Sequence, residues 1–446
     1  MKKARKKLEK LRTVPVVAGC KGAGGYDNGY ALAYERLTDH LTDKTGPRHR
    51  LWRIRAKQIV TATGAIERPL SFAGNDIPGV MLASAVRDYA VNFGTSVGDR
   101  TVVVTNNDDA YRTAIAMKQA GLDVPAIIDT RLLAGPLASE AAALGIRILY
   151  GKAISSVHGG KRVTGVAICS QAGEGGGVLE EINCDVVAMS GGWSPVVHLW
   201  SHCGGKLIWD EGQSHFHPDP SRPPLGADGT GFVSTAGIAH GAMTTRDCLV
   251  NGHDAGAAAA KLAGATGKAG KAAKGDAPVE AAMMPVWIMP QGAGYKLRSK
   301  MWLDYQNDVK VSDVQLAAQE GYESVEHTKR YTTLGMATDQ GKLSNINGLA
   351  VLSDALGQAI PATGTTTFRP PYTPISLGSI GGEARGDLFQ PLRKTPIHAW
   401  SDKNGAYWEP VGQWRRVYTY QRDDESIEDA VNREVKNTRD NLGLLD

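Results

Sequence analysis

The stretch Arg100–Asp129, RTVVVTNNDDAYRTAIAMKQAGLDVPAIID, decides the fold class of this chain. It begins with an apolar, β-branched run that ends at Thr105, which is typical of a buried strand. Residues 109–121 then place apolar side chains at helical spacing until a glycine stops the helix, and a second apolar run follows at 124–129. Strand, helix and strand in this order predict a βαβ unit of an α/β protein.

The turn of this unit argues against a bound dinucleotide. A dinucleotide-binding unit carries GxGxxG between its strand and its helix, whereas residues 105–110 read TNNDDA. No glycine admits a pyrophosphate there, and two carboxylates repel one. We therefore expect a unit that is Rossmann-like in shape but binds no dinucleotide at this turn.

Composition and charge limit the classes of protein to which this chain can belong. A chain of 446 residues with 42% hydrophobic residues predicts two or three domains, and a net charge of +4 gives no electrostatic case for nucleic acid. No apolar run approaches the roughly 20 residues that span a membrane, and no signal-peptide core follows Met1. The five cysteines are scattered, which favours reduced thiols and a cytoplasmic location. We interpret the basic start, Met1–Arg12, as an exposed helix face rather than a targeting or membrane-surface arm.

Strands, helices and turns alternate through the first part of the chain. The small residues at 61–65 follow an apolar strand, and they let a ligand approach the backbone closely. A strand at 231–235 leads into a glycine-rich turn at 236–241, which we expect to open a helix that runs to about Lys261. Such a helix start suits a phosphate or ribose, and tight packing of helix on sheet explains it equally well.

Composition also predicts where the domains change. A segment rich in Gly, Ala and Lys is typical of a flexible linker, and three short helical patterns at 311–320, 324–332 and 345–356 come after it. The predicted regions are an α/β oxidoreductase domain at 1–263, a linker at 264–282, a helical module at 283–385 and the opening of another domain at 386–446.

Two polar stretches carry the groups that hold a phosphorylated cofactor. They are KRYTTLGMATDQGK at 329–342 and GTTTFRPP at 364–371, and both combine hydroxyls, glycines and cations. A helix cap followed by a polar loop accounts for the same residues, so the pattern alone leaves both interpretations open.

The sequence offers weak candidates for catalysis or metal binding. His215 and His217 alternate beside two aspartates, but such pairs on a proline-rich loop are more often solvated than metal-bound. His327 follows Glu326, and neighbouring residues on a helix point apart. No nucleophile elbow, P-loop or HExxH pattern occurs. We predict no catalytic residue and no metal ligand in this chain.

Several motifs resemble the alpha subunit of heterotetrameric bacterial sarcosine oxidase. Besides the two polar stretches, they are AIERP at 65–69, FAGNDIPGVML at 72–82, NNDDAYR at 106–112 and YQNDV at 305–309. The resemblance runs from about Val14 to the end of the chain. It implies a chain truncated at both ends, which lacks the first glycine-rich turn of the family and stops just inside its folate-binding region.

The resemblance implies the fold in more detail. We expect an incomplete FAD/NAD-linked reductase-like (Rossmann-like) domain, a small ferredoxin-like helical module without cysteines, and the start of an aminomethyltransferase-like domain. A [2Fe–2S] cluster is excluded by the missing cysteines, which makes a flavin phosphate the more reasonable occupant of the helical module.

The resemblance also implies an activity. Such enzymes oxidise sarcosine to glycine with hydrogen peroxide and either formaldehyde or 5,10-methylenetetrahydrofolate. The amine is oxidised at FAD on the beta subunit, FMN lies at the alpha–beta boundary, the alpha subunit carries NAD, and tetrahydrofolate binds in the complete complex. Beta, gamma and delta subunits would be the partners. Two alternatives stay open: the alpha subunit of an opine or proline dehydrogenase, and a non-catalytic assembly subunit.

Individual site residues follow from the same resemblance. For NAD, the matching positions are Val16, Gly64, Ala239, Thr244 and Arg246. For FMN, the expected contacts are Thr338, Lys342, Thr366, Thr367 and Arg369.

Overall fold

The computed structural model describes residues 17, 19–384 and 386–443. Val16 and Met1–Arg12, to which a cofactor contact and a helix were assigned, lie outside these residues. The chain divides into two compact units: the larger one contains the described residues up to 48 and residues 52–374, and the smaller one contains residues 49–51 and those from 375 onward. Among the described residues, no helix combines the length and the apolar character needed to cross a membrane.

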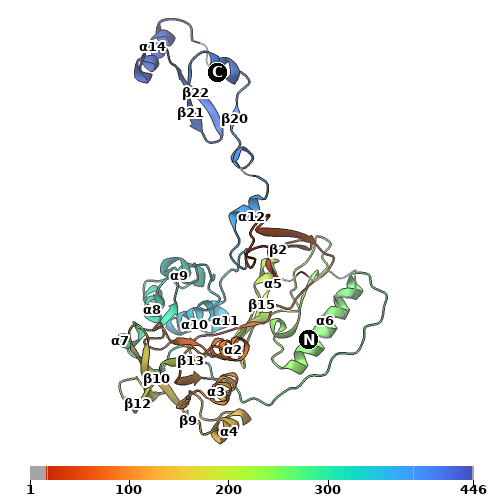
Figure 1. Cartoon of the computed structure of the whole chain (residues 1–446), viewed down its shortest axis with the longest axis vertical. Helices are drawn as coiled ribbons and strands as arrows, with labels where there is room; N and C mark the ends of the chain where they lie inside the picture. Colours follow the sequence, from red (N-terminus) through yellow and green to blue (C-terminus); the bar gives the residue numbers. More distant parts are fainter. Residues whose placement is uncertain (1–16, 18, 385, 444–446) are drawn as a thin grey trace. The chain divides into compact units, whose positions relative to one another are not determined.

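A parallel five-stranded sheet forms the centre of the larger unit, and it contains the βαβ unit predicted from the sequence (Figure 1). In sheet order its strands are β6 (Val80–Leu82), β13 (Val186–Ser190), β7 (Thr101–Thr105), β8 (Ala126–Asp129) and β9 (Arg147–Tyr150).

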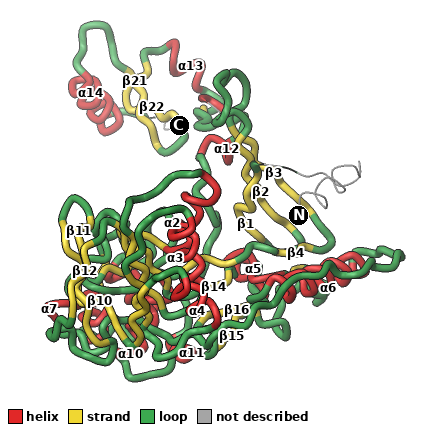
Figure 2. Tube along the Cα trace, turned by 60° about the horizontal axis from the view of Figure 1, so that its bottom comes forward, coloured by secondary structure: helices red, strands yellow, loops and turns green. Residues whose placement is uncertain are grey.

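The side chains of β7 show that both faces of this sheet are buried. Val103 belongs to a core that the sheet shares with helices α2 (Ala83–Phe93), α3 (Asp109–Gln119) and α4 (Pro136–Ala143). Val102 and Val104 belong to a second core, because successive side chains of a strand point to opposite faces. That core is shared with an antiparallel sheet, whose strands are β10 (Lys152–Gly159), β11 (Val163–Ser170) and β12 (Glu180–Asn183). Figure 2 shows the helices and this antiparallel sheet on opposite sides of the parallel strands.

A second, smaller group of strands belongs to the same unit. Strand β4 pairs in parallel with β17, and the other short strands form antiparallel sheets or ribbons. The bounds are β1 (Cys20–Gly25), β2 (Tyr30–Arg36), β3 (His49–Arg55), β4 (Ile59–Thr61), β5 (Ala65–Glu67), β14 (Trp193–Pro195), α5 (His198–His202), β15 (Leu207–Asp210), β16 (His215–Pro218) and β17 (Val233–Thr235).

The helix expected to open at residues 236–241 begins later than predicted. A 3-10 helix, η1 (Gly237–His240), ends at Gly241, whose φ of 100° is the left-handed conformation that glycine tolerates. Helix α6 (Thr245–Leu262) starts only after Thr244, whose hydroxyl accepts a hydrogen bond from the Asp247 N–H. The prediction was wrong here because the glycine run terminates a short helix instead of starting a long one.

The helical module contains the three predicted helices, which are confirmed as α8 (Val311–Gln319), α9 (Val325–Thr332) and α10 (Asn345–Ala355). They pack around a separate core that includes Leu303, Val314 and Leu352. The remaining elements of this region are α7 (Tyr295–Arg298), β18 (Trp302–Asp304), β19 (Val309–Lys310) and α11 (Ile360–Thr363).

The smaller unit consists of a three-stranded sheet with helices on either side of it in the sequence. The last helix begins after Ser426, whose side chain caps it by accepting a hydrogen bond from the Asp429 N–H. Its elements are α12 (Leu377–Gly381), η2 (Gly386–Leu388), β20 (Arg393–Lys394), α13 (His398–Lys403), β21 (Ala406–Val411), β22 (Trp414–Tyr420) and α14 (Ile427–Asp440).

Candidate functional site

The two polar stretches, which are separated by helix α10, meet around one cavity of about 240 Å³ in the helical module. The first contributes the last turn of α9 and the loop after it, and the second contributes the strand-like segment at 366–369. The lining residues are Glu326, Lys329, Arg330, Gly335, Met336, Gln340, Thr366, Thr367, Phe368 and Arg369.

Asn345 joins the two stretches from the start of α10. Its amide Nδ2 donates to Thr366 Oγ1 at 2.9 Å, and the side chain is buried. A Cβ atom on Gly341 would lie 2.0 Å from Asn345 Oδ1, and one on Gly335 would lie 2.4 Å from it. Both glycines also have positive φ, at 73° and 66°. The glycines of the first stretch are therefore required for the loop to close on Asn345.

The cavity has an excess of positive charge. Lys329, Arg330 and Arg369 face a single carboxylate, Glu326. Among the described residues, no carboxylate forms an ion pair with Lys329 or Arg369, whereas Arg330 lies 3.5 Å from Glu326. Three cations and one carboxylate line this half-enclosed cavity, and the excess of positive charge forms a site for an anion.

Glu326 remains charged despite its partial burial. Burial raises the pKa of this carboxyl, but the hydrogen bond from the Thr367 N–H and the nearby Lys329 and Arg330 outweigh it, so that the pKa is lowered overall. Its Oε1 accepts that backbone hydrogen bond at 2.6 Å. No local pattern in the sequence signals this role, because the contact joins residues 41 positions apart.

The predicted FMN contacts divide between this cavity and its surroundings. Thr366, Thr367 and Arg369 line it. Thr338 does not, since its hydroxyl donates to Gln306 Oε1 at 3.3 Å on the surface. Lys342 lines a smaller neighbouring cavity of about 30 Å³, where its Nζ donates to Asp339 O at 2.8 Å and lies 4.5 Å from the ring centre of Tyr372.

The smaller cavity contains polar atoms that lack partners. Phe368 lines both cavities, and His198 of α5 lies in the smaller one with its ring centre 4.2 Å from that of Phe368. Within the described residues, His198 Nδ1 and Nε2, Asn345 Oδ1 and Thr365 Oγ1 have no hydrogen-bond partner. Burial and then the charge of Lys342 lower the pKa of His198 to about 3, so the imidazole is neutral. Neither His198 nor Asn345 was identified as a site residue from the sequence.

The comparisons with known proteins identify the region that forms the cavity. Residues 298–384 match the sarcosine oxidase A3 domain, and this range contains every residue that lines the larger cavity. The alpha subunit of sarcosine oxidase from Corynebacterium sp. (strain P-1) is 39% identical over 433 residues, which are 95% of this chain and 44% of that protein. The chain is a homologue of sarcosine oxidase alpha subunits. It spans less than half of the length of that relative.

Two more distant matches come from a sequence comparison and from a solved structure. An opine oxidase component from Rhizobium meliloti (strain 1021) is 23% identical over 383 residues, which cover 77% of this chain and 79% of that protein. The crystal structure of L-proline dehydrogenase from P. horikoshii superposes with a TM-score of 0.58 at 19% identity, covering 84% of this chain and 68% of that chain. These matches confirm the mixed α/β fold, while the ferredoxin-like and aminomethyltransferase-like assignments stay predictions.

The described residues expected to bind NAD lie at the start of α6 and in the turn before it, apart from Gly64. Ala239 is fully buried, and Thr244 caps α6. At the start of α6, the Arg246 N–H donates to Asp276 O at 3.0 Å and the Asp247 N–H to the Thr244 hydroxyl, so the helix's own chain uses the groups that would bind phosphate. Gly64 has a φ of 75° and open space at its Cβ position. The two N–H groups at the start of α6 are therefore not free for a phosphate, and the NAD contacts stay a prediction.

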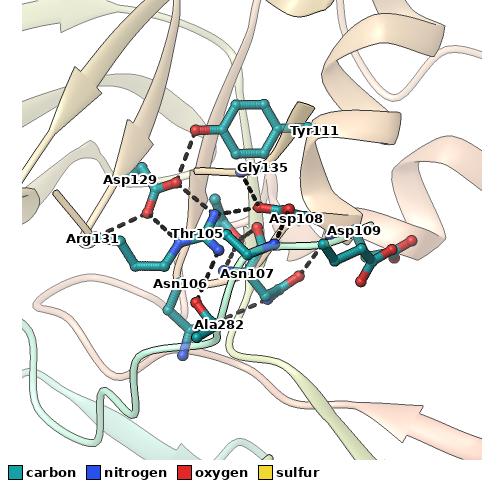
Figure 3. Close-up of polar contacts among 12 residues, drawn as sticks. Thr105, Asn106, Asn107, Asp108, Asp109, Tyr111, Asp129, Arg131, Gly135 and Ala282 are labelled. Atoms are coloured by element: carbon teal, nitrogen blue, oxygen red, sulfur yellow. Dashed lines mark hydrogen bonds and ion pairs between the residues drawn. The ribbon is translucent and has the colours of Figure 1, made fainter. Parts of the chain in front are cut away.

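In the βαβ unit of the homologue too, the polar groups at the start of the helix are bonded within the chain (Figure 3). Asp108, at the start of α3, accepts hydrogen bonds from the N–H groups of Gly135 and Ala281, and Arg131 donates to it at 2.8 Å. Asn106 donates from its side chain to Met284 O at 2.7 Å. Residues 281–284 thus lie over the end of β7, where a dinucleotide would bind. This agrees with the expectation that the turn TNNDDA binds none.

The histidine pair expected to be solvated is partly buried instead. Strand pairing places His215 opposite Asp210, but His215 is 1% exposed and its Nδ1 lies 3.1 Å from Trp193 O. Asp219 accepts from Ser221 and Arg222. Among the described residues, no three His, Cys, Asp or Glu side chains are grouped so that they could hold a metal ion. The expectation that these histidines are solvated was wrong, because they lie in the two-stranded ribbon of β15 and β16, where the side chain of His215 is buried.

Proposed function

We propose that this chain acts as an alpha-type subunit of a sarcosine-oxidising complex and holds the phosphate end of FMN in the cavity of the helical module. The observation that carries the proposal is the meeting of Lys329, Arg369 and the hydroxyls of Thr366 and Thr367 at one half-enclosed cavity. The excess of cations over carboxylates and the nearby hydroxyls match the charge and the hydrogen-bond acceptors of a phosphate monoester.

The size of the cavity suits part of FMN rather than all of it. At about 240 Å³, it is smaller than the roughly 300–1,000 Å³ of pockets that enclose a whole drug-sized ligand. The remainder of the cofactor would then be covered by a partner protein, as the resemblance to heterotetrameric enzymes implies. When bound, FMN would supply the chemistry of an electron carrier between a flavin on the partner and oxygen.

In this proposal the residues of the chain bind and orient. Lys329 and Arg369 neutralise the phosphate charge, and Asn345 fixes Thr366 against it. The neutral imidazole of His198, whose nitrogens have no partner among the described residues, and the ammonium of Lys342 give the smaller cavity hydrogen-bonding groups. None of these residues abstracts a proton from the amine, because the oxidation is assigned to FAD on a beta subunit.

The wider reaction follows from the family. Sarcosine would be oxidised to glycine, with hydrogen peroxide and either formaldehyde or 5,10-methylenetetrahydrofolate as the other products, in a complex with beta, gamma and delta subunits. FAD and tetrahydrofolate would belong to that complex. We derive no step through NAD, because the two N–H groups at the start of α6 are not free for a phosphate.

A related opine or proline dehydrogenase subunit is the second candidate. The match to the opine oxidase component covers 79% of that protein, against 44% of the sarcosine oxidase relative, and this coverage favours the alternative. The identity of 39% against 23% and the match to the A3 domain favour sarcosine. A non-catalytic assembly subunit would retain the fold but leave the cavity without a ligand.

Titration of FMN against the full chain tests the proposal. We expect the wild-type chain to bind FMN more tightly than riboflavin, which lacks the phosphate, as measured by flavin fluorescence. Lys329→Gln and Arg369→Gln should each weaken FMN binding about tenfold without affecting riboflavin, because each removes a charged partner of the phosphate.

Lys300→Gln serves as the matched control, since Lys300 is exposed and does not line the cavity. Equal affinity of the wild type and Arg369→Gln for FMN would refute the site. Co-purification with a flavoprotein partner, followed by amine oxidation with sarcosine, an opine and proline, separates the candidate functions. Sarcosine turnover by the chain without any partner would refute the assignment of oxidation to a beta subunit.

A further inference from the structure

Glu326 is the one carboxylate among the residues that line the cationic cavity. It lies in the first turn of α9, and its Oε1 accepts the Thr367 N–H at 2.6 Å, while its Oε2 lies 3.5 Å from Arg330 Nη2. A phosphate in this cavity needs the same two kinds of group, a backbone N–H and a guanidinium. The side chain therefore occupies part of the position that an anion would take.

We propose that Glu326 determines specificity in this cavity by acting as a resident anion that an incoming phosphate must displace from Thr367 and Arg330. The inference rests on the proposed function of the cavity and adds which phosphates it accepts. A free phosphate gains little after this displacement. A phosphate monoester with a large planar group makes further contacts that offset the displacement, so the cavity selects FMN over inorganic phosphate.

A purely structural role for Glu326 makes a different prediction. If the side chain only anchored the segment at 366–369, then glutamine, whose side-chain oxygen accepts the same hydrogen bond, would leave anion binding unchanged. If the negative charge excludes anions, Glu326→Gln keeps the hydrogen bond and removes the repulsion. The same substitution therefore separates anchoring from exclusion.

The experiment compares the wild-type full chain with Glu326→Gln and Glu323→Gln at one fixed ionic strength. Glu323 is exposed three positions before Glu326 and lies outside the cavity, so it controls for the change in net charge. Inorganic phosphate is titrated by calorimetry, and FMN and riboflavin by flavin fluorescence. A thermal unfolding measurement on each of the three proteins checks that it is folded.

We expect Glu326→Gln to bind inorganic phosphate and FMN about fivefold to tenfold more tightly, since a like charge a few ångströms away is removed, and to bind riboflavin unchanged. The relative gain should be larger for inorganic phosphate than for FMN. Glu323→Gln should match the wild type.

The outcomes distinguish this inference from the proposed function. If the wild type binds FMN through its phosphate and Glu326→Gln binds FMN and phosphate equally or more weakly, the inference fails and the proposed site stands. If Glu326→Gln binds FMN and the wild type does not, Glu326 excludes FMN as well as free phosphate, and both the selection inferred here and the proposed FMN site of the wild type fail. If neither protein binds FMN or phosphate, both the site and the inference fail.

Discussion

Replacing Arg131 by Met should destabilise the larger unit more than any change to a surface ion pair. The guanidinium is 4% exposed and lies 2.8 Å from Asp108 Oδ1 and 2.8 Å from Asp129 Oδ2, both of which are essentially buried. It also donates to Ala282 O at 3.2 Å and so ties residues 281–284 to the βαβ unit. Methionine keeps much of the volume but leaves two buried carboxylates without a cation.

The magnitude follows from what remains bonded after the substitution. Removing one partner of a buried ion pair costs about 3–5 kcal/mol. Asp108 would keep the hydrogen bonds from Gly135 and Ala281, and Asp129 would keep those from the Tyr111 hydroxyl and the backbone N–H of residue 131. Because these donors stabilise both carboxylates in part, we expect the lower end, about 3 kcal/mol.

Urea unfolding followed by tryptophan fluorescence and circular dichroism measures this loss. Arg147→Met is the matched control, because Arg147 forms an ion pair with Glu180 but is 49% exposed, and such pairs contribute at most about 1 kcal/mol. The triple variant Asp108→Asn, Arg131→Met, Asp129→Asn removes all three charges and should recover part of the loss. A loss below 1 kcal/mol for Arg131→Met, or a triple variant less stable than the single one, would refute the reasoning.

Two further predictions concern the cavities of the helical module. Gly341→Ala should abolish FMN binding and destabilise the chain by about 2 kcal/mol or more, because its Cβ would lie 2.0 Å from Asn345 Oδ1. The control is Gly357→Ala, since Gly357 has a similar φ of 64° and open space at its Cβ position. In a thermal melt the control should lose only about 1 kcal/mol, and its FMN binding should be intact. His198→Gln should make stability less sensitive to acid. In the wild type, the pKa of His198 is about 3 in the folded chain and about 6.5 in the unfolded chain. Below pH 6.5 the unfolded wild-type chain therefore takes up more protons than the folded one, and its stability falls. From pH 7 to 5 the wild type should lose about 2 kcal/mol more than the variant in urea titrations, and equal losses would contradict a neutral, buried imidazole.

Local patterns predicted the secondary structure where period and end signals agreed. The run ending at Thr105 and the helix before Gly121 were found as expected, because apolar periodicity is decided within the segment itself. The start of α6 was misplaced, since a glycine-rich turn is compatible with ending one helix or beginning another. Only the left-handed Gly241 and the hydroxyl cap of Thr244 decide between them.

The candidate site was predictable in composition but not in arrangement. Thr366, Thr367 and Arg369 were identified from the residue types that bind phosphate, and they line the cavity. Lys342 belongs to the same kind of pattern but faces Tyr372, because the loop before α10 turns it toward the smaller cavity. The carboxylate of Glu326 was dismissed from the sequence, since its contact with Thr367 depends on tertiary structure alone.

The distribution of helix starts and cations explains why the anion site of this chain lies in the helical module. Among the described residues, the starts of α3 and α6 and the cavity beside the end of α9 each have features of a phosphate site. The first contains Asp108, which its own neighbours saturate, and in the second the N–H groups of residues 246 and 247 already have acceptors.

At the cavity, by contrast, three cations face the single acid Glu326, which lies 3.5 Å from Arg330, so that positive charge is in excess. A helix start that is already bonded offers an anion only its dipole, which acts over one turn, whereas cations in excess provide charge-assisted hydrogen bonds. At the starts of α3 and α6, the groups that could bind an anion are thus bonded within the chain itself. The capacity to bind a phosphate is retained where α9 and the segment at 366–369 meet.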